Sequence, residues 1–309
     1  MSWTDAIDEV LGGDQAIALA YATPADGVVL APVTNFGVRD RAAGTVTVNS
    51  SIGMWRKLER IRRKPHVSLV FHTRRHGFSD RPEFVLVQGR AALSEPIPDY
   101  PAVLGSTWDR FDGPRATGAF WKWWLRAYYT RVEIAVAVER VLTWPDLACT
   151  GEPAVRGTPL PATEPAAQEP PARGTGPRLD AASAATRASE LPDVLLGWIG
   201  ADRFPVVVPV EITGGDESGM RLAAPGGAVP AGGRRAGLTA HAFTRHVLGQ
   251  AQRIHTGWLE ADRGTIRYAP HTRAGHRLPP VPFLYRLAVG WGTRRGIRTR
   301  PNGLRGSSS

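Results

Sequence analysis

The chain has 309 residues and a formal net charge of +10, from 38 Lys and Arg against 28 Asp and Glu. A single hydrophobic core seldom grows past roughly 250–300 residues, so this length favours two domains. The only cysteine, Cys149, excludes an intramolecular disulfide framework and a thiolate metal cluster. Together with a start, MSWTDAIDEV, unlike a signal peptide, this favours the cytoplasm. No window offers about 18 uninterrupted apolar residues, so we expect no membrane span.

Short runs with a period of two indicate that the first half is rich in β-strands. Residues 17–21 and 28–33 flank turn residues at 24–27, which predicts a hairpin. Further strands are expected at 45–49, 66–72, 84–92 and 129–143. Strands with turn-like joints and few helices predict a mainly β fold class, a closed or nearly closed antiparallel barrel.

Residues 52–64 break this alternation. Met54, Leu58 and Ile61 recur at spacings of four and three, so we expect a short amphipathic helix that Pro65 ends. Its other faces carry six basic residues, which are Arg56, Lys57, Arg60, Arg62, Arg63 and Lys64.

An anion site is expected where this helix begins. The preceding strand ends at Asn49, so Ser50 and Ser51 lie beside backbone N–H groups at the positive end of the helix. Lys57 can reach back as a point charge, and Arg56 can offer two donors to phosphate oxygens. A phosphate monoester matches this charge and geometry best. The alternative is ordinary capping by a serine with a solvated basic helix face.

The rest of the chain divides into a linker and a second domain. Residues 146–190 are dense in Pro, Ala, Gly, Glu and Thr, which predicts a disordered linker after a domain at 1–145. Residues 191–309 repeat the layout weakly and end in a basic tail. They begin with a hairpin-like pair at 195–210, so we predict a degenerate second copy.

A local echo supports the duplication. HTGWLEA at 255–261 resembles VQGRAAL at 87–93, with Gly257 standing where Gly89 stands. The copy has no counterpart of the basic helix, because only AAPGGAVPAGGRRAG lies between Leu222 and Leu238.

A family resemblance rests on motifs that follow one another between residues 45 and 91. These are a strand, Asn-Ser-Ser, a helix with Arg-Lys-Leu, Lys-Pro, the strand His-Val-Ser-Leu-Val-Phe and a strand ending Val-Gln-Gly-Arg-Ala. Over residues 15–144 the chain resembles the pyridoxamine-phosphate-oxidase-like split-barrel family, whose members bind FMN or a related deazaflavin coenzyme. The resemblance implies that Lys57, Ser50 and Ser51 contact the cofactor phosphate and that Gln88 lies near the isoalloxazine ring.

The resemblance implies a flavin- or deazaflavin-dependent oxidoreductase with a small-molecule substrate. It also implies a dimer, or a second half that supplies the partner surface within one chain. No C-terminal tail with the pyridoxal-pocket residues of the vitamin oxidases is found, so oxidation of pyridoxamine phosphate is not expected. The basic run at residues 60–64 is a solvated helix face or grips the polyglutamate tail of a deazaflavin coenzyme.

Two functions of other classes stay open. One is a protein that binds flavin, deazaflavin or haem without turnover. The other is a basic surface binder of acidic lipid or nucleic acid, because residues 283–306 form a cationic, partly amphipathic tail. Of these partners, nucleic acid is the less expected.

The histidines and tryptophans give weaker signals. No metal site is expected at His72 and His76, which follow a strand, and the pairs 241/246 and 271/276 are expected to be solvent-exposed. The tryptophans at 108, 121, 123 and 124 wall an aromatic pocket or pack in a core helix.

Overall fold

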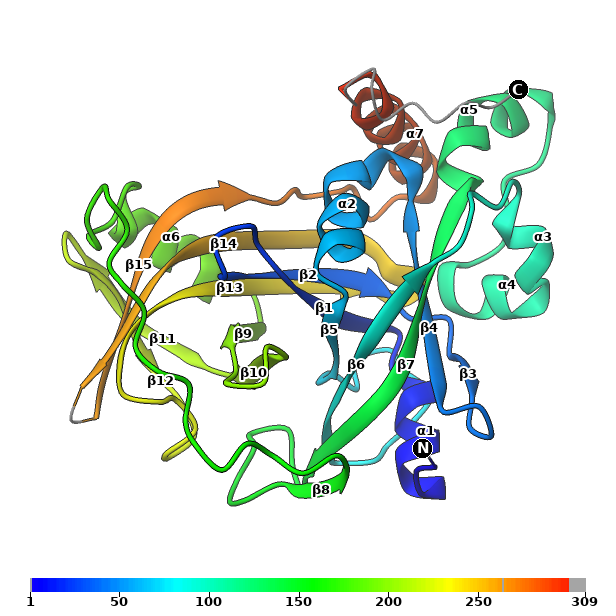
Figure 1. The fold of residues 1–309 in the computed structure, drawn as a ribbon. Helices are drawn as coiled ribbons and strands as arrows, with labels where there is room; N and C mark the ends of the chain where they lie inside the picture. Colours follow the sequence, from blue (N-terminus) through cyan, green and yellow to red (C-terminus); the bar gives the residue numbers. More distant parts are fainter. Residues whose placement is uncertain (1, 263, 300–309) are drawn as a thin grey trace.

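The computed structural model describes residues 2–262 and 264–299 and contains two curled antiparallel sheets, one in each half of the chain (Figure 1). The first half contains α1 (Asp5–Gly13), β1 (Ala16–Ala22), β2 (Val28–Thr34), β3 (Val38–Asp40), β4 (Thr45–Ser51), the 3-10 helix η1 (Ile52–Met54), α2 (Trp55–Arg63), β5 (His66–Phe71), β6 (Phe84–Leu93), α3 (Tyr100–Leu104), α4 (Ser106–Asp112), α5 (Ala119–Tyr129), β7 (Arg131–Trp144) and β8 (Ala154–Gly157). The second half contains α6 (Ala181–Ser189), β9 (Asp193–Ile199), β10 (Pro205–Pro209), β11 (Glu211–Asp216), β12 (Gly219–Ala223), β13 (Gly232–Thr244), the 3-10 helix η2 (Arg245–Val247), β14 (Leu248–Asp262), β15 (Thr265–Ala274) and α7 (Pro282–Arg298).

The two sheets have the same strand order. The first runs β2-β1-β5-β6-β7-β4-β3, with β8 added beside β7, and the second runs β10-β9-β13-β14-β15-β12-β11. Each strand of the second sheet therefore corresponds to the strand eight numbers earlier in the first. This confirms the mainly β fold class, a split barrel that is duplicated along the chain.

The predicted echo around two glycines is confirmed as a shared β-bulge. The register shifts between Gln88 and Gly89 where β6 pairs with β7, and between Thr256 and Gly257 where β14 pairs with β15. A Cβ atom at Gly89 would collide with a backbone carbonyl oxygen of the neighbouring strand, and so would one at Gly257. Only glycine allows this close backbone approach in both copies.

The two copies pack against each other through matching strands. β2 lies against β13 of the second sheet, and its counterpart β10 lies against β5, the counterpart of β13. This reciprocity is that of an approximate two-fold axis, as in a symmetric dimer. The interface core is apolar and includes Ala18, Ala20, Leu30, Val70, Leu86, Leu195 and Val207.

Two histidines meet at this axis. In the first copy Gly89 pairs with Val67, and His72 lies five residues after Val67. In the second copy Gly257 pairs with Ala236, and His241 lies five residues after Ala236. They are therefore equivalent positions of the two copies, and their Nε2 atoms lie 2.7 Å apart. Both side chains are buried, so the prediction that His241 is solvent-exposed is wrong.

The predicted helix at 52–64 is present as η1 followed by α2. Ser51 accepts a hydrogen bond from the N–H of Gly53 at 3.2 Å, so a serine does cap the first turn. Ile61 is fully buried in the first core, and Leu58 packs against that core at its edge. Met54 is half exposed, contrary to its predicted place on the apolar face, because it lies in η1 ahead of the α-helical turns.

Residues 146–190, predicted as disordered, include two elements. β8 pairs with β7, and the alanine side chains of α6 pack against the second sheet. Such small side chains carried no signal of burial, yet they let a helix approach a sheet closely. The stretch between these elements contains neither helix nor strand, although the N–H of Gln168 donates to the carbonyl of Gly233 at 2.8 Å.

Limited proteolysis tests the division into domains. We expect the first cuts between residues 158 and 178, because this stretch is mostly exposed and has no regular structure. The sites are read from the masses of the fragments. Early cleavage inside the first sheet, with 158–178 protected, would contradict the division.

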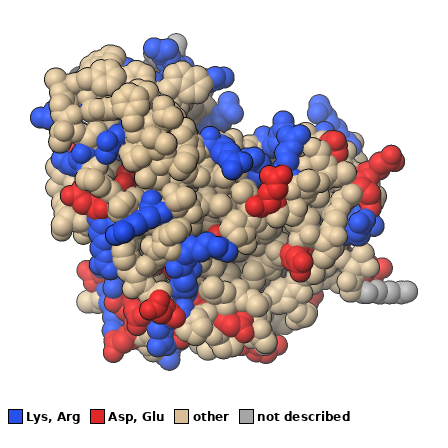
Figure 2. All heavy atoms as spheres, turned by 180° about the vertical axis from the view of Figure 1, so that it is seen from behind, with Lys and Arg blue, Asp and Glu red and all other residues tan. Residues whose placement is uncertain are grey.

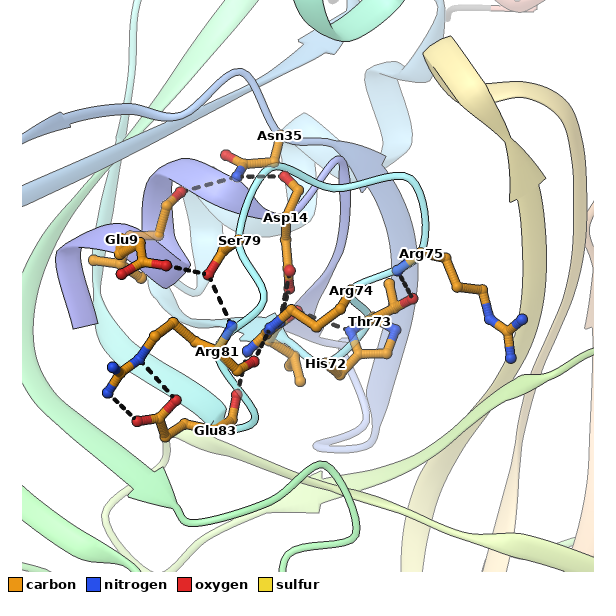
Figure 3. Close-up of polar contacts among 12 residues, drawn as sticks. Glu9, Asp14, Asn35, His72, Thr73, Arg74, Arg75, Ser79, Arg81 and Glu83 are labelled. Carbon is orange, nitrogen blue, oxygen red and sulfur yellow. Dashed lines mark hydrogen bonds and ion pairs between the residues drawn. The ribbon is translucent and has the colours of Figure 1, made fainter. Parts of the chain in front are cut away.

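A buried ion pair anchors the loop after β5 (Figure 3). Asp14, at the end of α1, accepts hydrogen bonds at 2.6 Å from Arg74, and Arg74 also donates to backbone carbonyls of the same loop. The pKa of Asp14 is raised to about 7, because burial outweighs the attraction of Arg74. This network fixes the chain next to His72, directly at the interface between the copies.

The predicted basic tail begins as a helix. α7 covers 282–298, and residues 300–306 lie outside the described part of the chain. Figure 1 shows α7 next to α5, at one end of both sheets. No helix in the described residues has the length and apolarity that a membrane span requires.

Candidate functional site

A cavity of about 1290 Å³ lies between the two copies. The first copy lines it with β1, β2, β4 and α2, and the second with β13, β14, β15 and α7. Five of the six predicted site residues line it, namely Asn49, Ser50, Ser51, Arg56 and Lys57. The structure thus brings these residues together at one cavity, and their role in binding a ligand stays a prediction.

One end of the cavity gathers donors and positive charge. The side chains of Ser50 and Ser51 are buried at the end of β4, and Lys57 lies on the first turns of α2. Arg131, the first residue of β7, pairs with Ser51 across the sheet. Its Nε atom is buried and has no hydrogen-bond partner among the described residues. A buried donor without a partner is costly, so this end is suited to an anion that would accept its hydrogen bond.

The electrostatics of Lys57 fit the same conclusion. Burial, assisted by repulsion from Arg131, lowers the pKa of Lys57 to about 8. An anion bound between the two side chains would favour the charged ammonium form and move this pKa upward again. Arg131 itself is oriented by the ring of Tyr128, whose centroid lies 4.2 Å from its guanidinium carbon.

The whole cavity selects for negative charge. None of its described lining residues is Asp or Glu, whereas eight are basic, namely Arg56, Lys57, Arg60, Arg131, Arg178, Arg235, Arg273 and Arg277. A cleft lined by one sign of charge concentrates ligands of the opposite sign. We therefore expect an anionic occupant.

The walls beyond the anion end are largely apolar. Val29, Ala31 and Val33 of β2 face Ile254 of β14 across the copies. Such a slot accepts a flat aromatic ring, which an open polar surface would not.

Two hydroxyl groups supply polarity in this slot. Thr256 and Thr272 lie on neighbouring strands of the second copy, with their Oγ1 atoms 2.6 Å apart. When the two copies are aligned on Gly257 and Gly89, Thr256 occupies the position of Gln88. The strand partner of Thr256, Thr272, then occupies the position of Arg140, which is the strand partner of Gln88. The second copy therefore places Thr256 next to the slot, at the position for which the first copy has Gln88.

Gln88 itself lies outside the cavity. Its amide nitrogen donates to the carbonyl of Pro205 at 2.8 Å, and its Oε1 accepts from Nε of Arg140 at 2.8 Å. Arg140 also pairs with Asp202 at 2.5 Å. The side chains of Gln88, Arg140 and Asp202 fill the place that is equivalent to the cavity, so Gln88 does not line the cavity that Lys57 lines.

α7 covers the anion end. The Oγ1 atom of Thr293 lies 3.5 Å from Oγ of Ser51, and both residues are buried. A Cβ atom at Gly296 would strike the carbonyl of Gly53 in η1, so glycine is needed for this contact. The helix thereby excludes water from the serines, which is a role that the sequence pattern of the tail did not suggest.

Other candidates from the sequence lie elsewhere. None of the tryptophans at 108, 121, 123 and 124 lines the cavity, since Trp108 stacks on Phe36 in a separate core. The wall of aromatic residues considered for them is therefore wrong. No group of three or more His, Cys, Asp or Glu side chains able to hold a metal ion occurs in the described residues.

No protein-family model and no curated protein sequence matches the chain. Several solved structures are similar to it. A putative pyridoxamine 5'-phosphate oxidase from Listeria innocua is 20% identical, with a TM-score of 0.30, over 44% of this chain and 94% of that one. A FAD-binding protein from Mesorhizobium loti is 22% identical, with a TM-score of 0.29, over 46% and 95%. An F420 reductase is 17% identical, with a TM-score of 0.32, over 43% and 94%. The chain is thus similar, over less than half of its length in each case, to proteins named for pyridoxamine-phosphate oxidation, FAD binding and F420 reduction.

Proposed function

We propose that the protein is an oxidoreductase that binds FMN, or a deazaflavin coenzyme, in the cavity between its two copies and acts on a small-molecule substrate in the cytoplasm. One observation carries the proposal: buried serines, Lys57 and the Nε of Arg131, which has no hydrogen-bond partner among the described residues, converge at one end of a basic cavity with apolar walls. The sequence motifs from Asn49 to Lys57 support the same cofactor class.

Each part of the cavity has a role in this proposal. Ser50, Ser51 and Arg131 would donate hydrogen bonds to the phosphate, and Lys57 would balance its charge. The apolar side chains of β2 and β14 would hold the ring system, with the hydroxyl groups of Thr256 and Thr272 as hydrogen-bonding groups beside it. When bound, the cofactor supplies hydride transfer. The protein holds it, orients its ring and keeps water from the phosphate end through α7.

The cavity has room for a substrate beside the cofactor. Ligand sites commonly measure roughly 300–1,000 Å³, and this one measures about 1290 Å³. A second group of basic residues, Arg178, Arg235 and Arg273, comes from the segment before α6 and from the second sheet. A negatively charged substrate, or the acidic tail of a deazaflavin coenzyme, would find a matching charge there.

Haem is the poorer occupant for this cavity. Among its lining histidines, His241 is the buried one, and its Nε2 atom is engaged with Nε2 of His72 at 2.7 Å. An axial ligand needs a free ring nitrogen. A flavin or deazaflavin, which needs no axial ligand, is therefore favoured over haem.

The visible spectrum of the purified protein, with mass identification of the released cofactor, tests the proposal. Flavin or deazaflavin bands are expected, and titration of the stripped protein with FMN should give saturable binding. A Soret band, or the absence of binding of FMN and of a deazaflavin coenzyme, would contradict the proposal.

One cofactor per chain is expected. The equivalent cleft of the other copy holds Gln88, Arg140 and Asp202, and residues 224–231 between β12 and β13 form no helix. Isothermal titration with FMN measures the stoichiometry directly. A value of two would show that the second copy keeps a working site.

A further inference from the structure

A cluster of large apolar side chains is exposed on η1, α5 and α7. Trp123 is 58% exposed, Trp291 56% and Phe283 56%. Met54, Phe120 and Leu284 of the same three elements are also exposed, and we name these six residues together the α5–α7 face. Contiguous exposed aromatic residues are rare on proteins without a partner for them.

The face is a fixed surface, because the two helices are joined along their length. The rings of Trp121 and Phe283 meet edge to face at 5.5 Å, and the indole N–H of Trp124 donates to the carbonyl of Arg286 at 3.2 Å. Arg294 of α7 lies over the ring of Trp123 at 4.3 Å. Its aromatic side chains are thus held outward by neighbours.

The segments that form this face carry basic residues and no acidic ones. Residues 114–131 and 275–299 contain no Asp or Glu. Leu284, Trp291 and Arg295 follow at spacings of seven and four, so they share one stripe of α7. The exposed cations near the aromatic residues are Lys122, Arg126, Arg295 and Arg298. In Figure 2 the lobe at upper left is mostly neutral, with Lys and Arg at its edges and a few Asp or Glu at its lower edge.

We propose that the α5–α7 face docks on the surface of an anionic lipid membrane. Tryptophan and phenylalanine side chains insert at the level of the headgroups, and Lys and Arg attract acidic lipids, each adding affinity. With no membrane-spanning helix in the described residues, such attachment is peripheral. Two other occupants fit less well. A second copy would bring arginines against arginines, and duplex nucleic acid offers no apolar layer for outward tryptophans.

The placement of the face links it to the cavity. Trp291 and Met54 are exposed on the face and also line the cavity. A docked molecule would therefore have the opening of its cavity close to the lipid surface. Membrane docking does not depend on which cofactor the cavity holds.

Flotation with vesicles tests the proposal with the full chain. Vesicles of phosphatidylcholine with about one third phosphatidylglycerol should bind the protein at least about tenfold more strongly than phosphatidylcholine alone, since several cations act together. Trp123→Ser with Phe283→Ser, two residues outside the cavity, should weaken this binding by at least about tenfold. Arg295→Gln with Arg298→Gln should reduce it severalfold and lessen its dependence on salt.

Leu160→Ser is the matched control, because Leu160 is also an exposed apolar residue but lies far along the chain from α5 and α7. It should bind vesicles like the unchanged protein. Circular dichroism and FMN titration check that each variant is folded. Equal binding of all variants, no preference for acidic lipid, or binding to DNA in place of vesicles would overturn the proposal.

Discussion

Replacing Lys57 by Ala is expected to weaken FMN binding by roughly ten- to a hundredfold while the fold stays intact. A charge-assisted contact to phosphate contributes about 1.5–3 kcal/mol, which corresponds to that range of affinity. Lys57 lies at the anion end of the cavity rather than in the core, so its loss removes a contact and opens no hole among apolar side chains. Fluorescence titration of the stripped protein with FMN measures the change.

Riboflavin, which has no phosphate, provides the internal control. The unchanged protein should bind it more weakly than FMN, and Lys57→Ala should narrow the difference between the two ligands. Equal affinity of the unchanged protein for both, unaltered by the substitution, would show that no phosphate site exists between Asn49 and Lys57.

Two neighbours on α2 separate binding from folding. Ile61 is fully buried, so Ile61→Ala should lower the free energy of unfolding by about 2–5 kcal/mol through a cavity in the first core. Leu58 is only partly buried, and its replacement should have a smaller effect. Under conditions in which they are folded, the Ile61 and Leu58 variants should both keep the preference for FMN over riboflavin, which Lys57→Ala reduces.

The paired histidines at the axis are expected to make stability fall in acid. Burial lowers the pKa of His72 from 6.5 to about 4, and it also lowers the pKa of His241. Between pH 6.5 and 4 the unfolded chain then binds more protons than the folded one, so stability falls as the pH falls through this window. From pH 7 to 4.5, His72 alone accounts for about 2–3 kcal/mol.

The comparison must be made between variants, because other groups titrate nearby. Burial raises the pKa of Asp14 to about 7 and that of Asp193 to about 6, although Arg74 and Arg75 oppose this, and both shifts act in the opposite direction. Urea unfolding of the unchanged protein and of His72→Gln at both pH values isolates the histidine. The exposed His76 is the matched control, and an equal change on His76→Gln would contradict the assignment to the axis.

Local periodicity was sufficient for much of the fold. The hairpin of β1 and β2 and the long closing strand β7 lie where the pattern predicted them. β7 alternates between buried and more exposed residues, whereas β1 is buried on both faces and alternates between large and small apolar side chains. The start of α2 was placed too early, since spacing alone does not distinguish a 3-10 turn from an α-helical one. α6 was missed because alanine-rich sequence carries the same composition as a linker.

The site was harder to predict, because it is built from both copies. The part of the anion end that comes from residues 49–57 was visible as a motif, whereas Arg131, Thr293 and the Thr256 of the neighbouring slot come from distant parts of the sequence. Gln88 was expected near the ring, but its side chain bonds to Pro205 outside the cavity. The equivalent residue of the second copy, Thr256, lines the cavity instead. The shared glycines at 89 and 257 were the signal that would have paired these positions, and His72 with His241.

The two copies lie in one chain, and this changes how the site assembles. A cavity between separate subunits exists only above the concentration at which they associate, whereas a covalent link keeps the halves together at any dilution. A substitution in a homodimer also alters both sites at once. Here a change at Thr256 alters one cleft and leaves Gln88 in the other cleft unchanged. One cleft can therefore bind a ligand while the other holds side chains that join the two copies.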